Sequence, residues 1–166
     1  ILESLDELLP SFNVIHQTGT ANFETVKASA LSLITDEALR SRYHPIAFVP
    51  VEVLNTALHT ASIVIGRAGS GTIFEIAVHG KPSILIPIPE EISHDQRTNA
   101  YAYARKGGGT VLEEENLTDG LLTAEINRIM GDPEVYKSMS SAALAFAPRD
   151  AGTKIADLLR SIYSTH

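Results

Sequence analysis

Short apolar runs alternate along this chain with longer stretches in which apolar residues recur every three or four positions. The runs predict strands, and the longer stretches predict helices. We expect strands at residues 13–18, 46–51, 62–67, 83–88 and 110–112. We expect helices at residues 1–9, 22–34, 52–60, 72–79, 93–106, 118–130, 133–146 and 150–163. Strand and helix therefore alternate over most of the sequence.

The strands expected in the middle of the chain, 62–67 and 83–88, are mostly apolar at successive positions. Such runs are typical of strands that are covered on both faces, as in parallel sheets. Together with the alternating helices they favour an α/β fold built on a Rossmann-like, doubly wound parallel sheet. At 166 residues the chain is long enough for one domain with a substantial core. Ligands of such sheets bind beyond the carboxyl ends of the strands.

Composition narrows the classes of ligand. The formal net charge of −7 argues against nucleic acid, which binds basic surfaces, and against a polybasic contact with a membrane. The chain has no cysteine, and its histidines lack the spacing of a metal pair, so we expect no metal site. The lack of cysteine fits a cytoplasmic protein. No apolar run has the length of a membrane span.

The most informative segment is residues 63–77, Ile-Val-Ile-Gly-Arg-Ala-Gly-Ser-Gly-Thr-Ile-Phe-Glu-Ile-Ala. It predicts a buried strand, a glycine-rich turn and a helix that opens at Ser70, Gly71 and Thr72. The free N–H groups and the positive dipole end of such a helix suit a phosphate. Glu75, one turn later, is placed to accept from the hydroxyls of a ribose. The segment favours a sugar nucleotide, and the alternative is a plain tight turn followed by a solvated glutamate.

Polar residues also follow the first and last expected strands. Thr18 is placed to offer a hydroxyl and a backbone N–H to a phosphate, whereas we expect His16 to be a buried structural residue. The acidic run at 113–115 is most simply a solvated strand exit.

A further polar group opens the helix expected at 93–106. Asp95, Gln96 and Asn99 offer the mixture of donors and acceptors that sugar hydroxyls need. The alternative is that Asp95 or Ser93 simply caps the helix.

Several motifs occur together in one order: His16-Gln17-Thr18-Gly19, Arg67-Ala68-Gly69-Ser70, Phe74-Glu75-Ile76-Ala77, Gly80-Lys81-Pro82 and Asp95-Gln96-Arg97-Thr98-Asn99-Ala100. Their order and spacing over residues 13–159 resemble the C-terminal half of the MurG family. This family transfers N-acetylglucosamine from UDP-N-acetylglucosamine to the lipid-linked intermediate of peptidoglycan. The resemblance implies a GT-B glycosyltransferase with two Rossmann-like domains, of which residues 1–166 are the domain that binds the sugar donor.

The resemblance implies the following substrate-binding residues: Thr18, Phe48, Val49, Arg67, Ser70, Gly71, Thr72, Glu75, Asp95, Gln96 and Asn99. Phe48 and Val49 would lie beside the uracil, with Val49 using its backbone. Glu75 would bind the ribose. Arg67 would close the strand before the turn.

The remaining roles concern the diphosphate and the sugar. The resemblance implies that Gly71 and Thr72 donate backbone N–H groups to the α-phosphate and that Thr18 contacts the other phosphate. The residues that would face the N-acetylglucosamine are Ser70, Asp95 and Gln96. The implied reaction is an inverting transfer without a metal ion or cofactor, in which the start of the helix stabilises the departing UDP.

The resemblance also implies parts that this sequence does not contain. In the family, a strand with a Gly-Gly-Ser-type phosphate loop precedes the first helix. An N-terminal acceptor domain supplies the catalytic base and the membrane contact, so we expect no catalytic residue in this chain and little activity from it alone. The whole enzyme would lie at the inner face of the plasma membrane.

Other functions remain open at this point. The chain could be a stand-alone donor-binding subunit of a two-chain lipid-linked glycosyltransferase. It could also be a domain of the UDP-N-acetylglucosamine epimerase type, although residues 95–99 supply no obvious set of catalytic groups for that reaction. The last alternative is an α/β domain without a ligand.

Overall fold

The structure, a computed structural model, describes residues 1–118, 120–148 and 150–163. Its strands are β1 (Val14–Gln17), β2 (Tyr43–Ile46), β3 (Val64–Gly66), β4 (Ser83–Leu85) and β5 (Gly109–Val111). β1 pairs with β2 in one sheet, and β3, β4 and β5 form a second sheet in that order. Every one of these pairings is parallel, which confirms the predicted α/β class. The described strands nevertheless form two sheets instead of the one continuous sheet expected.

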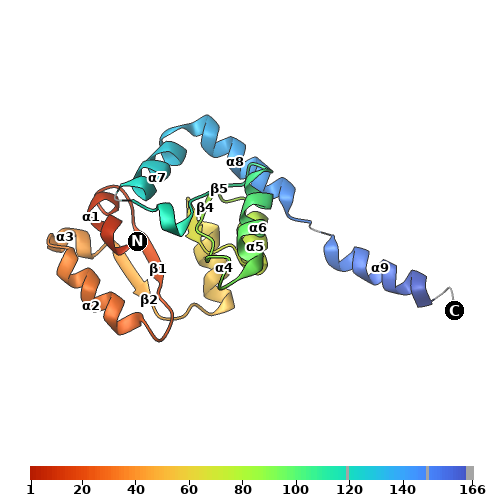
Figure 1. The fold of residues 1–166 in the computed structure, drawn as a ribbon, viewed down its shortest axis with the longest axis horizontal. Helices are drawn as coiled ribbons and strands as arrows, with labels where there is room; N and C mark the ends of the chain where they lie inside the picture. Colours follow the sequence, from red (N-terminus) through yellow and green to blue (C-terminus); the bar gives the residue numbers. More distant parts are fainter. Residues whose placement is uncertain (119, 149, 164–166) are drawn as a thin grey trace.

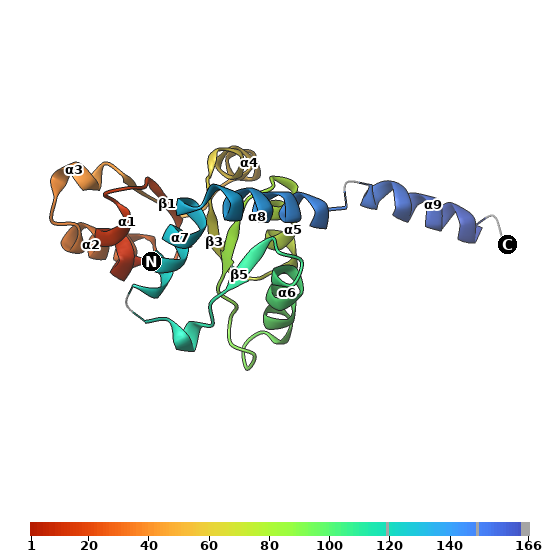
Figure 2. The same cartoon turned by 90° about the horizontal axis from the view of Figure 1, so that it is seen from above.

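The helices of the described chain are α1 (Leu5–Leu8), α2 (Phe23–Leu33), α3 (Glu37–Arg40), α4 (Val51–Thr60), α5 (Ser70–Val78), α6 (His94–Ala104), α7 (Leu121–Gly131), α8 (Pro133–Phe146) and α9 (Ala151–Tyr163). Short 3₁₀ turns lie at Leu2–Ser4 and Glu114–Asn116. α1, α2 and α3 lie beside the sheet of β1 and β2, and α5 and α6 lie beside the sheet of β3, β4 and β5 (Figure 1, Figure 2). α8 contacts both α5 and α7. The sequence pattern does not predict α3.

β4 is the most deeply buried strand, since Ser83, Ile84 and Leu85 are each 0% exposed. The residues of β3 are only half-buried. The difference follows from position, because β4 has a partner strand on each side whereas β3 pairs with β4 alone among the described strands. The strand predicted at 83–88 is therefore confirmed as a covered strand over Ser83–Leu85 only, and the strand predicted at 62–67 is confirmed over Val64–Gly66 with partial burial.

The predicted second strand, 46–51, is wrong over most of its length. β2 ends at Ile46, and Pro50 is already the N-cap residue of α4. The fixed backbone angle of proline suits a helix start, which ends the extended segment early. Pro45 lies within β2 and is tolerated because β2 pairs with β1 alone among the described strands, as an edge strand does.

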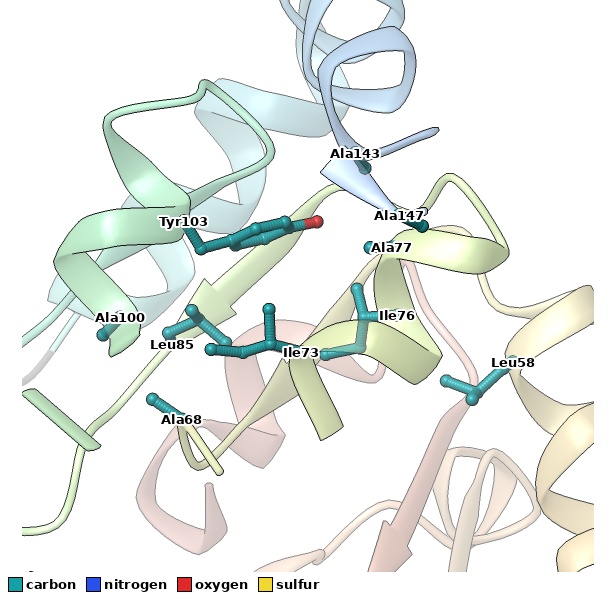
Figure 3. Packing of buried hydrophobic residues seen from close by; sticks show 10 residues of the cluster. All are labelled: Leu58, Ala68, Ile73, Ile76, Ala77, Leu85, Ala100, Tyr103, Ala143 and Ala147. Atoms are coloured by element: carbon teal, nitrogen blue, oxygen red, sulfur yellow. The ribbon is translucent and has the colours of Figure 1, made fainter. Parts of the chain in front are cut away.

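The largest buried cluster lies where α5, α6 and α8 pack over β4 (Figure 3). α5 contributes Ile73, Ile76 and Ala77 to this cluster, and α6 contributes Tyr103, which is 0% exposed. Burial of each large apolar side chain contributes about 1.5–3 kcal/mol to folding. Because one face of α5 is held in this way, the start of the helix has a fixed position relative to the end of β3.

α9 differs from the other long helices because none of its residues is buried. Both views place it away from the rest of the molecule (Figure 1, Figure 2). Its exposed apolar residues are Ile155, Leu158, Leu159, Ile162 and Tyr163. No helix in the described part of the chain is both long and apolar enough to cross a membrane.

Candidate functional site

The turn between β3 and α5 presents open backbone donors. Gly69 is the N-cap residue, in an extended conformation (φ −62°, ψ 141°), and no side chain caps this end of α5. No described group accepts a hydrogen bond from the N–H groups of Ser70, Gly71 and Thr72, and the first turn contains no acidic residue. A Cβ added at Gly71 would meet nothing within 4 Å, so the space in front of this turn is open. The predicted helix start is confirmed, and its donors and dipole favour an anion.

Glu75 lies on the exposed face of α5, opposite the buried Ile73 and Ile76. Its carboxylate has no hydrogen bond or ion pair with another described residue. Its backbone carbonyl lies 2.8 Å from Nδ1 of His79. The side chain is thus not turned into the core, which is the arrangement that binding of a ribose requires.

Arg67 links the carboxyl ends of the three strands of the second sheet. It directly follows β3, and its Nη1 donates to the carbonyl of Ile86, after β4, at 3.2 Å. The same guanidinium donates to both carboxylate oxygens of Glu114, after β5, at 3.0 and 3.1 Å. The hydrogen bond from Arg67 lowers the pKa of Glu114. The side chain of Arg67 is still 48% exposed, so part of its charge faces solvent beside the turn.

Gln96 and Asn99 lie against the same turn. Oε1 of Gln96 accepts from the N–H of Ala68 and from the N–H of Ile88, each at 3.2 Å. Nδ2 of Asn99 donates to the carbonyl of Ala68 at 3.5 Å. Asp95 is exposed in the first turn of α6. The structure therefore brings Gln96 and Asn99 to the start of α5.

The end of β1 offers fewer free groups than expected. The N–H of Thr18 donates to the carbonyl of Ile46 at 2.9 Å, so it is not open to a ligand. The hydroxyl of Thr18 lies 3.1 Å from the carbonyl of Gly19 and 3.4 Å from that of Ile46. Nδ1 of His16 lies 2.8 Å from the hydroxyl of Tyr43. Partial burial lowers the pKa of His16, which is half-buried rather than buried as predicted.

Phe48 and Val49 lie between β2 and α4. Phe48 is 67% exposed, whereas Val49 is 7% exposed. An exposed aromatic ring at the carboxyl end of a strand is available for stacking on a base, whereas Val49 is buried.

The acidic run after β5 was interpreted above as a solvated strand exit. This interpretation is wrong for Glu113, whose side chain is only 17% exposed, and it is incomplete for Glu114, which is exposed but paired. Glu113 accepts from the hydroxyl of Tyr101 at 2.8 Å and lies 3.0 Å from Nε of Arg97. The hydrogen bond to Glu113 raises the pKa of Tyr101. Glu114 pairs with Arg67. These two carboxylates pair with Arg67 and Arg97. The pairs depend on how strands and helices pack against each other, which the local sequence does not reveal.

A hollow of about 290 Å³ lies on the outer side of α6, lined by Arg97, Thr98, Tyr101 and Arg105. It does not include the start of α5 or Glu75. Among the residues that the structure describes, no group of histidine, aspartate and glutamate is arranged to hold a metal ion.

Comparison with known proteins places this geometry in context. Residues 1–157 match the glycosyltransferase family 28 C-terminal domain. A relative from Thermodesulfovibrio yellowstonii, named UDP-N-acetylglucosamine--N-acetylmuramyl-(pentapeptide) pyrophosphoryl-undecaprenol N-acetylglucosamine transferase, is 35% identical over 96% of this chain and 42% of its own length. A relative of the same name from Rhizobium etli is 30% identical over 95% of this chain and 40% of its own length.

The fold also matches a solved structure. The crystal structure of Acinetobacter baumannii MurG superposes with a TM-score of 0.80 at 24% identity, covering 97% of this chain and 44% of that one. The chain thus spans about two fifths of the length of these proteins.

Proposed function

Because this chain belongs to the glycosyltransferase family 28 C-terminal domain family, we propose that it binds UDP-N-acetylglucosamine as the sugar donor. In the whole enzyme, N-acetylglucosamine is transferred to a lipid-linked N-acetylmuramyl-pentapeptide in peptidoglycan synthesis. The observation that carries the proposal is the uncapped start of α5 with an exposed carboxylate one turn beyond it. The names of the relatives support the choice of sugar.

The nucleotide occupies the edge formed by the carboxyl ends of the strands. The N–H groups of Gly71 and Thr72 bind one phosphate, and the hydroxyl of Thr18 contacts the other. Glu75 accepts hydrogen bonds from the ribose. Phe48 and the backbone of Val49 hold the uracil, and the residues that face the sugar are Ser70, Asp95, Gln96 and Asn99.

The transfer proceeds by attack of an acceptor hydroxyl on the anomeric carbon. The bond from this carbon to the diphosphate oxygen breaks, UDP leaves, and the configuration inverts. Negative charge grows on the departing diphosphate in the transition state, where fixed N–H donors and a helix dipole stabilise it. The exposed part of Arg67 adds a positive charge at the same edge. We propose that these groups make a metal ion unnecessary.

The rest of the enzyme supplies what this chain lacks. We propose that an N-terminal acceptor domain provides the catalytic base, the site for the lipid-linked acceptor and the contact with the inner face of the plasma membrane. The two-fifths coverage of the relatives leaves room for such a domain. The sugar donor binds between the two domains.

Calorimetric titration with UMP, UDP and UDP-N-acetylglucosamine tests the proposal. We expect UDP to bind at least about tenfold more tightly than UMP, because its second phosphate adds a charge-assisted hydrogen bond from the hydroxyl of Thr18 and a further negative charge beside the helix dipole of α5. UDP-N-acetylglucosamine is expected to bind at least as tightly as UDP. Equal affinities for UMP and UDP, or binding of none of the three, would contradict it.

A further inference from the structure

We propose that Gln96 is a positioning residue, which holds the turn before α5 in the conformation that receives the diphosphate. The inference rests on the proposed function for its ligand, but its structural part stands without it. The family resemblance assigns Gln96 only a contact with the N-acetylglucosamine. Its contacts point to a second role toward the phosphates.

Two side chains of α6 bind the backbone of Ala68, one at its N–H and the other at its carbonyl. Its N–H donates to Oε1 of Gln96 and its carbonyl accepts from Nδ2 of Asn99. Ala68 is 0% exposed, so water does not readily replace these partners. A buried backbone N–H without an acceptor is costly, and the turn would move to find one. Because Gly69, the N-cap residue, follows Ala68 directly, such a movement displaces the phosphate-binding N–H groups.

The same oxygen also holds the segment after β4, through the N–H of Ile88. The group that faces two N–H donors must be the carboxamide oxygen, so the orientation of the side chain follows from its partners. α6 is itself anchored, since Ala100 and Tyr103 are 0% exposed in the core. Gln96 thus connects a fixed helix to the ends of both β3 and β4.

This orientation has a consequence for recognition. With Oε1 engaged by two N–H groups, the remaining hydrogens on Nε2 make Gln96 a hydrogen-bond donor only. It can donate to a sugar hydroxyl oxygen but does not accept from one. The positioning role and a sugar contact are therefore compatible, and they use opposite ends of the carboxamide.

UDP separates the two roles because it carries no N-acetylglucosamine. Replacement of Gln96 by methionine keeps the length of the side chain and removes both polar atoms. We expect Gln96→Met to bind UDP about tenfold more weakly than the wild-type protein. A side chain that served only the sugar would leave UDP affinity unchanged. Thr98→Ala, on the same helix, is the control for substitution in α6 and is expected to bind UDP normally.

A core variant distinguishes positioning from a general loss of stability. Ile129→Val in α7 is expected to lower the melting temperature, because it removes a buried methylene, and to leave UDP affinity unchanged. If Ile129→Val weakened UDP binding as much as Gln96→Met at a similar loss of melting temperature, the positioning role would be overturned.

Hydrogen exchange without ligand tests the contacts independently of the proposed function. Gln96→Glu keeps an oxygen for both N–H groups but loses the Nε2 donor. We expect the amides of Ala68 and Ile88 to be protected in the wild-type protein and in Gln96→Glu, and to exchange at least about tenfold faster in Gln96→Met. The glutamate variant is compared only without ligand, since its charge repels a diphosphate. Unchanged exchange in Gln96→Met would overturn the proposal even if UDP binds, whereas faster exchange without any UDP binding would overturn the proposed function alone.

Discussion

The starts of α5 and α8 are two helix N-termini that satisfy their backbone in different ways. At α8, Oδ1 of Asp132 accepts from the N–H groups of Glu134 and Val135 at 2.9 and 3.3 Å. At α5, Gly69 occupies the N-cap position, and no side chain accepts a hydrogen bond from the first N–H groups of the helix. The backbone angles of the two N-cap residues are both extended. The difference therefore lies in the side chain rather than in the path of the chain.

This difference separates a helix start that serves folding from one that is available to a ligand. A carboxylate cap contributes about 0.5–2 kcal/mol to stability relative to alanine. The start of α5 forgoes that contribution and keeps its N–H groups and dipole exposed at the carboxyl end of β3. A glycine N-cap after an apolar strand, without an acid in the first turn, is thus a signal that can be found in sequence.

Converting the open start of α5 into a capped start like that of α8 is the strongest test of the comparison. Gly69→Asp gives α5 the cap of α8, and its Cβ has room, since the nearest atom is 3.8 Å away. We expect UDP affinity to fall by at least about 100-fold, because a carboxylate beside the diphosphate repels it with several kcal/mol. The free energy of unfolding should stay unchanged or rise slightly.

Gly69→Ala is the matched control, because it adds a Cβ without an acceptor. It should bind UDP far better than Gly69→Asp does. Calorimetry and chemical denaturation of both variants measure the two effects. If the aspartate variant bound UDP normally, the start of α5 would not be the phosphate site.

The next largest effect is expected at Glu75, whose carboxylate has no partner among the described residues. Glu75→Ala should weaken UDP binding by about 1–3 kcal/mol, the range for a lost charge-assisted hydrogen bond. Competition between UDP and 2′-deoxy-UDP adds a sharper readout, since only the wild-type protein should prefer the ribose. Glu134→Ala on α8 is the control for removal of an exposed helix carboxylate. A preference for ribose that survives in Glu75→Ala would remove Glu75 from the site.

Asp132→Ala tests the capped helix start, that of α8. We expect it to lower the free energy of unfolding by about 1 kcal/mol, because the N–H groups of Glu134 and Val135 lose their acceptor. UDP affinity should not change. Denaturant titration and calorimetry measure the two quantities, and a loss of UDP affinity here would show that the two helix starts are not independent.

The smallest effect concerns the ion pair that supports the end of β3. The lowered pKa of Glu114 means that its pair with Arg67 stabilises the fold above the unfolded-state value of 4.5, and that this contribution is lost as pH falls through the folded-state pKa below 4.5. Both side chains are partly exposed, so Glu114→Gln should lower stability by less than about 1 kcal/mol. The difference between wild type and variant should vanish in acid. A difference that persists at low pH would point to a cause other than the charge.

The part of the site that lies on one continuous segment was predictable from sequence. The apolar run before Gly66 and the glycines at 69 and 71 predict a strand, a turn and a helix, and the structure has all three. The exposure of Glu75 follows from its position on a helix whose other face carries Ile73 and Ile76. Local periodicity is enough for such features because each depends on residues within two helical turns.

Features that depend on neighbouring strands were not predictable. The pairing of Arg67 with Glu114 joins residues 47 positions apart, and the two N–H groups held by Gln96 come from two different loops. The open N–H expected at Thr18 is absent because β1 pairs with β2 up to Ile46, a register that the misplaced second strand had hidden. The sequence contains these side chains but not the contacts that the packing of the sheet creates.

Backbone amide spectra during titration test the central claim most directly. In ¹H–¹⁵N correlation spectra, the amide signals of Gly71 and Thr72 should shift on addition of UDP and should not shift with uridine at the same concentration. The amides of Glu134 and Val135, at the capped start of α8, should stay unmoved. Saturable UDP binding that leaves Gly71 and Thr72 unshifted would contradict the account.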